Sequence, residues 1–284
     1  MPFAFRMVIR INILAVVICS LAAAMQQAAP VEISYFFASN PEPLYEPVVL
    51  RFQVYNNLAQ AITVDLGQDG TSNFKFFVVR PDGTQEQLRP PVKEGLTPVG
   101  IVKVGPGQTY TKEILLSNWL EFDRPGHYQI SASLTDPIKD ENGRIVPANS
   151  EGHINLELVP RDEKQLQTTC ADLLKKISSA PSYQQADDAA KALSAIKDPV
   201  VVPYLKEATG FWHLEPITIP ALDRIGDLTA VEALISLLSS KEHDTNLLAR
   251  FALEKIENRT ADSAIKDRIK LALKPSSIEN QKPY

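Results

Sequence analysis

Apolar residues in the C-terminal third of the chain recur at helical spacing within a repeated unit. The unit is clearest at Ala221-Leu222, Ile225 and Asp227, an A-L-x-x-I-x-D pattern. Two further copies stand 29 residues earlier and 31 residues later: Ala192-Leu193, Ile196 and Asp198, and Ala252-Leu253, Ile256 and Asn258. A fixed period of this length is typical of stacked structural repeats.

Each copy predicts a short helix followed by a second one. Leu222 and Ile225 are three residues apart and share a helix face, while the small Ala221 lets a neighbouring helix approach closely. Gly226 supplies the left-handed residue that ends a helix, and Asp227 is placed to cap the next one with its side-chain oxygen. Two short helices cannot bury an apolar face alone, so we expect the copies to stack around one core.

This pattern resembles the short HEAT-like repeats first noted in phycobilisome lyases, over about Gln184–Leu273. The resemblance implies a helical solenoid that offers an extended surface to other proteins, and it implies nothing about chemistry. In such a stack Leu193, Leu222 and Leu253 are expected to lie along one continuous apolar seam.

From Val31 to Leu158 the apolar period changes to two, which is typical of strands with one buried face. The predicted strands are Val31–Phe37, Val48–Asn56, Ala61–Leu66, Phe74–Arg80, Gln108–Leu116, Gly126–Leu134 and His153–Val159. Pro81-Asp82-Gly83, Gly105-Pro106-Gly107 and Asn142-Gly143 mark turns between strands. Many short strands without an intervening helix predict an antiparallel β-sandwich.

Two stretches of this half resemble bacterial immunoglobulin-like domains. Arg124–Ile130 (RPGHYQI) is similar to the P-G-x-Y-x-[IL] start of a late strand, and Val104–Gln108 (VGPGQ) is similar to the turn before the preceding strand. The resemblance implies that the Tyr128 hydroxyl bonds back to the backbone. The cysteine pair of antibody-type domains is absent, which excludes that subfamily.

These patterns together predict the fold class. We expect two domains, an all-β antiparallel immunoglobulin-like sandwich at residues 31–160 and an all-α HEAT-like helical-repeat solenoid at residues 163–274. Val159–Asp162 joins them, and this short connection predicts that the domains pack against each other. Residues 275–284 are polar and lack periodicity, which predicts a disordered tail.

Residues 1–24 have the pattern of a secretory signal peptide. Arg6 and Arg10 precede the apolar run Ile11–Ala24, which ends in the small residues that cleavage requires. The protein is therefore expected to be exported, to the periplasm or the exterior, and to associate with a membrane only if this segment is retained as an anchor. A lipoprotein anchor at Cys19 is disfavoured by the bulky residue before it.

Charge and cysteine content narrow the classes of partner. The chain has 284 residues and a net charge of −5, which becomes −7 when Arg6 and Arg10 are removed with the signal peptide. A negative net charge argues against nucleic acid and anionic membranes as partners, because both need a basic surface.

Cys170 is the cysteine that remains after removal of the signal peptide, and its apolar-periodic setting predicts a small buried side chain rather than a reactive thiol.

The sequence contains no recognisable catalytic or metal-binding motif. Its four histidines, His127, His153, His213 and His243, are far apart, and the H-E-x-x-H, C-x-x-C, G-x-S-x-G and phosphate-loop patterns are absent. Asp136–Asn142 gathers three acids near a turn but lacks the alternating spacing of a calcium loop, and a solvated turn explains it as well. We therefore predict no catalytic residues, no metal, no cofactor and no enzymatic activity.

The candidate partner-binding site is the loop Phe211-Trp212-His213, between the first and second repeats. Trp is favoured at binding sites, and loops on rigid scaffolds often carry function. The alternative is that Phe211 and Trp212 only fill the space between sandwich and solenoid. Exposed aromatic side chains would favour binding, and burial against the sandwich would favour filling.

These observations predict a non-catalytic exported scaffold protein that binds another protein in the bacterial envelope. A second hypothesis is a carbohydrate- or small-ligand-binding module in the sandwich, with stacking residues drawn from Tyr35, Phe36, Tyr55, Phe77 and Trp119. An enzyme related to the lyases that share the repeat is a weaker alternative, because no residue set matches a catalytic pattern. Protease inhibition by loops of an immunoglobulin-like domain is another, without a matching loop motif.

Overall fold

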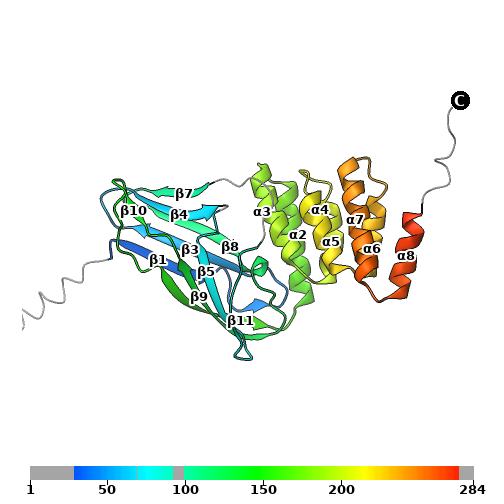
Figure 1. The fold of residues 1–284 in the computed structure, drawn as a ribbon, viewed down its shortest axis with the longest axis horizontal. Coiled ribbons are helices and arrows are strands. Elements are labelled where there is room, and N and C mark those ends of the chain that lie inside the picture. The colour runs from blue at the N-terminus through cyan, green and yellow to red at the C-terminus, as the bar shows by residue number, and fades with distance from the viewer. Residues whose placement is uncertain (1–28, 69, 92–98, 275–284) are drawn as a thin grey trace, which may run out of the picture.

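The structure, a computed structural model, describes residues 29–68, 70–91 and 99–274. The predicted signal peptide (1–24) and the predicted tail (275–284) lie outside these residues. Figure 1 shows strands in the N-terminal half of the chain, followed by a row of upright helices. We call these parts the sheet region (residues 31–159) and the helical region (residues 163–273).

The strands form where apolar and polar residues alternate. β3 (Val49–Asn56) and β9 (Gly126–Leu134) bury every second side chain. The other strands are β1 (Val31–Phe37), β2 (Glu42–Pro43), β4 (Ile62–Gln68), β5 (Phe74–Val79), β6 (Gln85–Gln87), β7 (Val99–Val104), β8 (Thr109–Leu115), β10 (Lys139–Asp140) and β11 (Glu151–Val159). Each strand predicted from the sequence exists, with ends that differ by two residues or fewer.

The strands assemble into three sheets, in the orders β1-β3-β8, β10-β4-β7 and β2-β11-β9-β5-β6. β2 pairs in parallel with the end of β11, and the other pairs between these strands are antiparallel. The prediction of an all-β, purely antiparallel immunoglobulin-like sandwich is therefore wrong. The strands are divided among three sheets, one pair is parallel, and the chain as a whole combines sheets with helices.

The observed sheets differ from the predicted sandwich because they include strands that the sequence did not predict. β2 has two residues, which are too few to show a period. β7 pairs with β4, with a register shift between Asp65 and Gln68, and so places β4 in a sheet separate from its chain neighbours β3 and β5. The number and order of sheets thus depend on pairings between segments far apart in the chain.

The core of the sheet region contains large side chains. Phe52, Phe76 and Tyr128 are fully buried. The Tyr128 hydroxyl donates to the backbone oxygen of Arg124 at 2.9 Å, which is the backbone bond expected for this residue. This bond lets the ring be buried without leaving an unpaired polar group.

Helices make up the C-terminal part of the chain. They are α2 (Glu163–Ser178), α3 (Tyr183–Ala195), α4 (Val202–Ala208), α5 (Glu215–Ile225), α6 (Leu228–Leu237), α7 (His243–Arg259) and α8 (Ser263–Leu273), with a short 3-10 turn, η2 (Pro199–Val201), before α4. A second 3-10 turn, η1 (Leu116–Asn118), follows β8 in the sheet region. The helical character predicted for this part is confirmed. Within the ranges that the structure describes, no helix is both long and apolar enough to cross a membrane.

The helices pack in two layers. α3, α5 and α7 lie side by side in one layer, and α2, α4, α6 and α8 form the other. Successive helices run in opposite directions, so the loops after α2, α4 and α6 lie at one edge of the stack (Figure 1). Leu193, Leu222 and Leu253 are fully buried in one hydrophobic cluster, as the repeat predicts, and Cys170 is buried in the same cluster.

Helix ends follow the sequence in two copies of the repeat and differ in the third. Gly226 has a φ of +61° and ends α5, after which the Asp227 side chain caps α6. Asp198 caps η2 in the same way. In the third copy the predicted cap Asn258 lies inside α7, and Asp262 caps α8. The later cap reflects a longer first helix in this copy.

Candidate functional site

The loop between α4 and α5 holds the predicted site residues. Trp212 and His213 both have positive φ angles, 53° and 55°, which residues other than glycine rarely adopt. Backbone hydrogen bonds close the turn on both sides, from Phe211 N–H to Ala208 at 3.1 Å and from Leu214 N–H to Phe211 at 3.0 Å. Backbone strain of this kind persists where the surrounding structure holds the residue in place.

Buried polar contacts beneath the loop hold it to the helices. The hydroxyls of Thr209 and Thr218 lie 2.8 Å apart, and both residues are buried. Each hydroxyl also contacts a backbone oxygen four residues earlier, at 2.9 and 3.1 Å respectively. Leu214 is fully buried in the helical core. The loop therefore presents its aromatic residues from a well-packed base.

The three predicted site residues have different surroundings. Phe211 is partly buried and packs against the helical core. Trp212 is 40% exposed, and His213 beside it is exposed. Neither aromatic residue belongs to the core of the sheet region. Phe211 and Trp212 thus do not fill the space between the two regions.

Exposed apolar residues occur nearby, at equivalent repeat positions of two neighbouring helices. Pro216 and Pro220 on α5 correspond to Leu247 and Phe251 on α7, 31 residues later in the sequence. Both prolines are exposed, and Leu247 and Phe251 are 38% and 50% exposed. Residues four apart share a helix face, and α5 and α7 lie side by side, so these residues share one side of the stack. We call these four residues, together with Trp212 in the loop between α4 and α5, the α5–α7 face.

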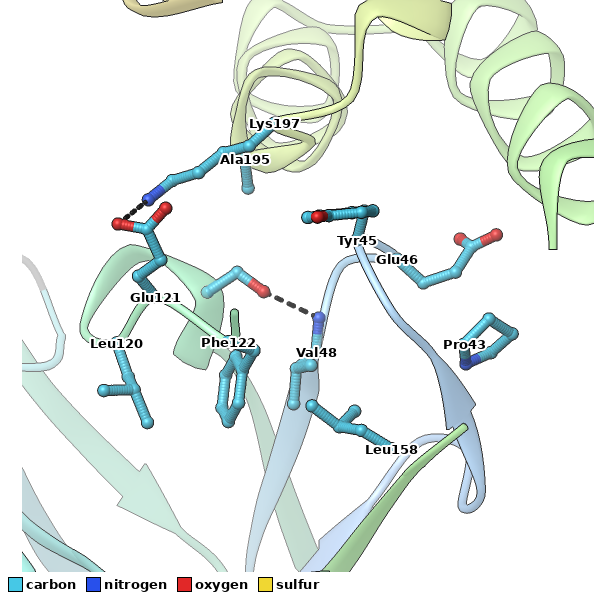
Figure 2. A pocket seen from close by; sticks show the side chains of 11 residues that line it. Pro43, Tyr45, Glu46, Val48, Leu120, Glu121, Phe122, Leu158, Ala195 and Lys197 are labelled. Carbon is cyan, nitrogen blue, oxygen red and sulfur yellow. Dashed lines mark hydrogen bonds and ion pairs between the residues drawn. The ribbon is translucent and has the colours of Figure 1, made fainter. Parts of the chain in front are cut away.

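A second candidate is the contact between the two regions, shown in Figure 2. Tyr45, in the segment between β2 and β3, has a φ of 75° and packs against both hydrophobic cores. Beside it lies a cavity of about 20 Å³, whose lining includes Val48 and Phe122 from the sheet region and Ala195 from α3. A volume of this size holds roughly one water molecule, which excludes this cavity as a site for an organic ligand.

Ion pairs strengthen the same contact. Arg161, in the connection before α2, donates to the Asp198 carboxylate at 2.5 and 3.1 Å. Lys197 pairs with Glu121 of the sheet region at 2.9 Å (Figure 2). Arg80 in turn donates to the backbone oxygen of Glu121 at 3.4 Å. These contacts position α3 and η2 against the sheet region.

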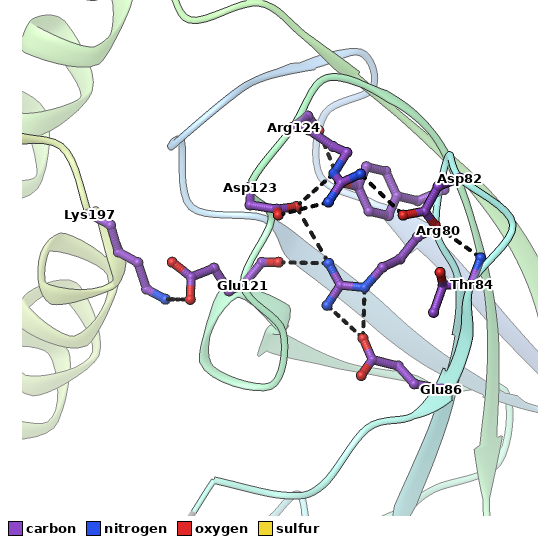
Figure 3. Close-up of polar contacts among 9 residues, drawn as sticks. Arg80, Asp82, Thr84, Glu86, Glu121, Asp123, Arg124 and Lys197 are labelled. Carbon is purple, nitrogen blue, oxygen red and sulfur yellow. Dashed lines mark hydrogen bonds and ion pairs between the residues drawn. The ribbon is translucent and has the colours of Figure 1, made fainter.

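Figure 3 shows the charge network on the sheet side of the Lys197–Glu121 pair. Arg80 pairs with Glu86 and Asp123, and Arg124 pairs with Asp82 and Asp123. The hydrogen bond from Arg124 is the largest of the effects that hold the pKa of Asp123 below its ordinary value. Positive and negative side chains alternate along this network, and all of them are partly or largely exposed. Each ion pair therefore contributes little to the free energy of unfolding, and the network mainly fixes the positions of these surface side chains.

Carboxyl groups at the contact have raised pKa values. Glu46 is 4% exposed, and burial raises its pKa even though the Thr169 hydroxyl donates to it at 3.0 Å. Burial and the charge of Glu46 raise the pKa of Glu42 to about 7. Burial also raises the pKa of Cys170 to about 12, which keeps the thiol protonated and unreactive at neutral pH.

Other polar clusters serve turns and strand surfaces. Among the described residues, no group of three or more His, Cys, Asp and Glu side chains could hold a metal ion. In the acidic stretch 136–142, Asp140 accepts from the N–H groups of Asn142 and Arg144 at 2.8 and 2.9 Å, which forms a turn. The Ser131 hydroxyl and His153 Nδ1 are 2.8 Å apart on paired strands, but this contact is on the exposed outer side of the sheet.

The aromatic residues considered for a stacking platform lie apart. Phe36 and Phe77 are exposed, at 37% and 49%, but belong to different sheets. Tyr35 and Trp119 make ring contacts with buried phenylalanines. Tyr55 lines a shallow groove of about 360 Å³ beside β1.

No protein-family model matches the chain, and no curated protein matches it. Among solved structures, it is similar to the sporulation control protein Spo0M of Bacillus subtilis, with 11% identity, 52% of this chain, 56% of that chain and a TM-score of 0.25. For the alkylpurine DNA glycosylase AlkC of Pseudomonas fluorescens these values are 15%, 46%, 31% and 0.23. For a beta-glucosidase of Listeria innocua they are 11%, 46%, 16% and 0.26. Similarities this low support no inference about fold or activity.

Proposed function

We propose that this protein is a non-catalytic, exported scaffold protein of the bacterial envelope that binds another protein through the α5–α7 face. The observation that carries the proposal is Trp212, which is 40% exposed on a loop that buried contacts hold in place. A loop backbone held in this way loses little conformational entropy on binding, and Trp is enriched among the residues that dominate protein interfaces. Leu247 and Phe251 extend the apolar surface on the adjacent helix.

The contact between the two regions supports the scaffold role. Arg161 and Asp198 pair at the linker, and Lys197 and Glu121 pair across the two regions. A partner bound at the α5–α7 face would therefore be held at a defined position relative to the sheet region. A scaffold protein needs such a fixed arrangement between the surface that binds its partner and the rest of the molecule.

Crosslinking of the chain from residue 25 onward to bacterial envelope extract tests the proposal. Trp212→Ala and Phe251→Ala are compared with Phe77→Ala, an exposed aromatic residue of the sheet region that serves as the matched control. We expect the unmodified chain and the control to recover the same partner in stoichiometric amounts. The two α5–α7 variants are expected to recover about 10- to 30-fold less, the effect of losing a residue that dominates an interface.

Two outcomes would contradict the proposal. Recovery that is unchanged in Trp212→Ala would place the binding surface elsewhere on the molecule. Failure of the unmodified chain to recover any stoichiometric partner would remove the scaffold role.

A second candidate function is small-ligand binding in the groove beside β1. Its volume of about 360 Å³ lies in the usual range for small-ligand sites. Glu32, Ser34 and Gln53 offer hydrogen-bonding groups there, and Tyr55 offers an aromatic surface for a sugar ring. A glycan array probed with the unmodified chain and with Tyr55→Ala tests this function. Binding that Tyr55→Ala loses would support it, and an array without hits would remove it.

A further inference from the structure

The contact between the sheet region and α2 contains two neighbouring acidic side chains. Glu46 is 4% exposed, and its carboxylate accepts from the Thr169 hydroxyl of α2 at 3.0 Å. Glu42, on β2, lies close enough for the charge of Glu46 to act on it. Figure 2 shows Glu46 beside Tyr45, which packs against both hydrophobic cores. Glu46 thus belongs to the interface that joins the two regions, and Glu42 lies near it on β2.

The groups that face these carboxyls do not offset their charge. Asp162, which caps α2, adds a third negative group near Glu46. From α2 itself the neighbouring groups are the uncharged Thr169 and Cys170. The cations Arg161 and Lys197 pair with other carboxylates, Arg161 with Asp198 and Glu163, and Lys197 with Glu121. Arg224 acts on Glu121 and Asp223. An ionised carboxylate in these surroundings loses hydration with little compensation.

We propose that this contact is a pH-dependent joint between the sheet region and the helical region, closed while Glu42 and Glu46 are protonated and loosened when they ionise. Ionisation places neighbouring negative charges at one interface, and their repulsion is relieved when β2 and the segment after it move away from α2. The position of the α5–α7 face relative to the sheets then depends on pH. The joint itself does not depend on that face binding a partner.

The direction of the pH dependence follows from the raised pKa values. Burial and neighbouring acids raise the pKa of both carboxyls above the ordinary value of 4.5, for Glu42 to about 7. A carboxyl whose pKa is raised in the folded state contributes stability that is complete below its ordinary pKa. That stability is lost as the pH rises through the folded-state pKa. The joint therefore weakens as the pH rises from about 4.5 through about 7.

Hydrogen exchange of the whole chain at a pH below 6 and at a pH above 8, expressed as protection factors, tests the joint. Peptides over residues 43–48 and 161–170 report on the contact, and peptides over β9 and α7 report on the two cores. We expect protection at the contact to fall about tenfold at the higher pH, while both cores keep theirs. Tenfold corresponds to one pKa unit, which allows for the partial exposure of Glu42.

Glutamine variants separate the carboxyls from other effects of pH. Glu46→Gln keeps an oxygen that can accept from Thr169 but cannot ionise. Glu42→Gln removes the ionisable group at the less buried position. Both variants are expected to lose at most about threefold in protection at the higher pH, less than half of the logarithmic effect of one pKa unit. Glu157→Gln removes an exposed carboxyl on β11 and serves as the control. At the higher pH it is expected to lose as much protection at the contact as the unmodified chain.

Three results would overturn the joint. The first is equal protection of the contact at both pH values in the unmodified chain. The second is a loss in the glutamine variants as large as in the unmodified chain, and Glu42→Gln decides alone if Glu46→Gln does not fold. The third is a parallel loss in β9 and α7, which would show unfolding of the whole molecule rather than opening at the contact.

Discussion

The two regions of the molecule are held together by cores of different kinds. In the sheet region, rings from separate segments meet, with centroid distances of 5.0 Å between Phe52 and Phe74 and 4.9 Å between Phe76 and Trp119. In the helical region the core consists mainly of Ala, Leu, Ile and Val, and each helix packs against its neighbours in the stack. One core is assembled from the whole region, and the other is built from successive helices.

The two kinds of core predict different effects for the loss of a buried side chain. A ring that contacts strands far apart in the chain supports several of them together, so its loss should weaken the whole sheet region. A stack of repeats has a stability that is close to a sum over neighbouring units. Loss of one buried side chain there should weaken the adjoining helices first.

The largest effect is expected for Phe52→Ala in the sheet region. Phe52 is fully buried and contacts the rings of Tyr35 and Phe74, so the variant should lose about 4 kcal/mol of unfolding free energy through lost burial and a cavity. Chemical denaturation measures the loss, and hydrogen exchange should show reduced protection in all three sheets. A loss confined to β1 and β3 would contradict the comparison.

Leu222→Ala in the helical region should follow, at about 3 kcal/mol, because Leu222 is fully buried in the middle of the stack. Hydrogen exchange should show weakened protection in α5 and in its neighbours α4, α6 and α7, while β9 keeps its protection. Leu166→Ala, buried in α2, is the matched control and should spare α7 and α8. Equal loss along the whole stack in both variants would show that the helices unfold as one unit.

Removing helix caps should have a smaller effect. Asp227 accepts from the Ala230 N–H at 2.7 Å, and Asp227→Ala should cost about 1 kcal/mol in thermal unfolding. Asp262→Ala removes the corresponding cap of α8, at the end of the described stack. Hydrogen exchange should increase in α6 and in its neighbours α5 and α7 in Asp227→Ala. In Asp262→Ala it should increase only in α8. The same spread in both variants would contradict the nearest-neighbour picture.

The smallest effect on stability is expected for Trp212→Ala. Its side chain is 40% exposed and lies outside both hydrophobic cores, so the unfolding free energy should change by less than about 0.5 kcal/mol. Chemical denaturation of the variant beside Thr218→Ala, which removes a buried hydroxyl under the loop, provides the comparison. A loss in Trp212→Ala as large as in Thr218→Ala would assign Trp212 a structural role.

The strands and the helices differ in how much of their assembly could be predicted. β3 and β9 alternate in polarity and could be placed to within two residues, whereas the pairing of β4 with β7 could not. Sheet order depends on which distant strands meet, and alternation within one strand carries no such information. The helical repeat does carry it, because equivalent positions in copies that cannot fold alone must share a core.

The candidate site was predictable only in part. Phe211 and Trp212 could be singled out because two large aromatic residues in a short loop need a partner or a packing role. Leu247 and Phe251 could not, because apolar residues on α7 are expected to face the core and only the structure shows these two exposed. Glu46 lacks a local pattern, since α2 contributes to its burial from more than a hundred residues away.

Residue pattern alone was enough to predict the helical character of residues 163–273, the positions of most strands, the helix end at Gly226 and the shared core of the stack. These features depend on residue type and spacing within a few positions, or on repetition. The order of the three sheets, the exposure of Trp212 and the burial of Glu46 depend on how the whole chain packs. Exposure and the local electrostatic environment depend on which distant segments meet in space, and that is settled only when the whole chain has packed.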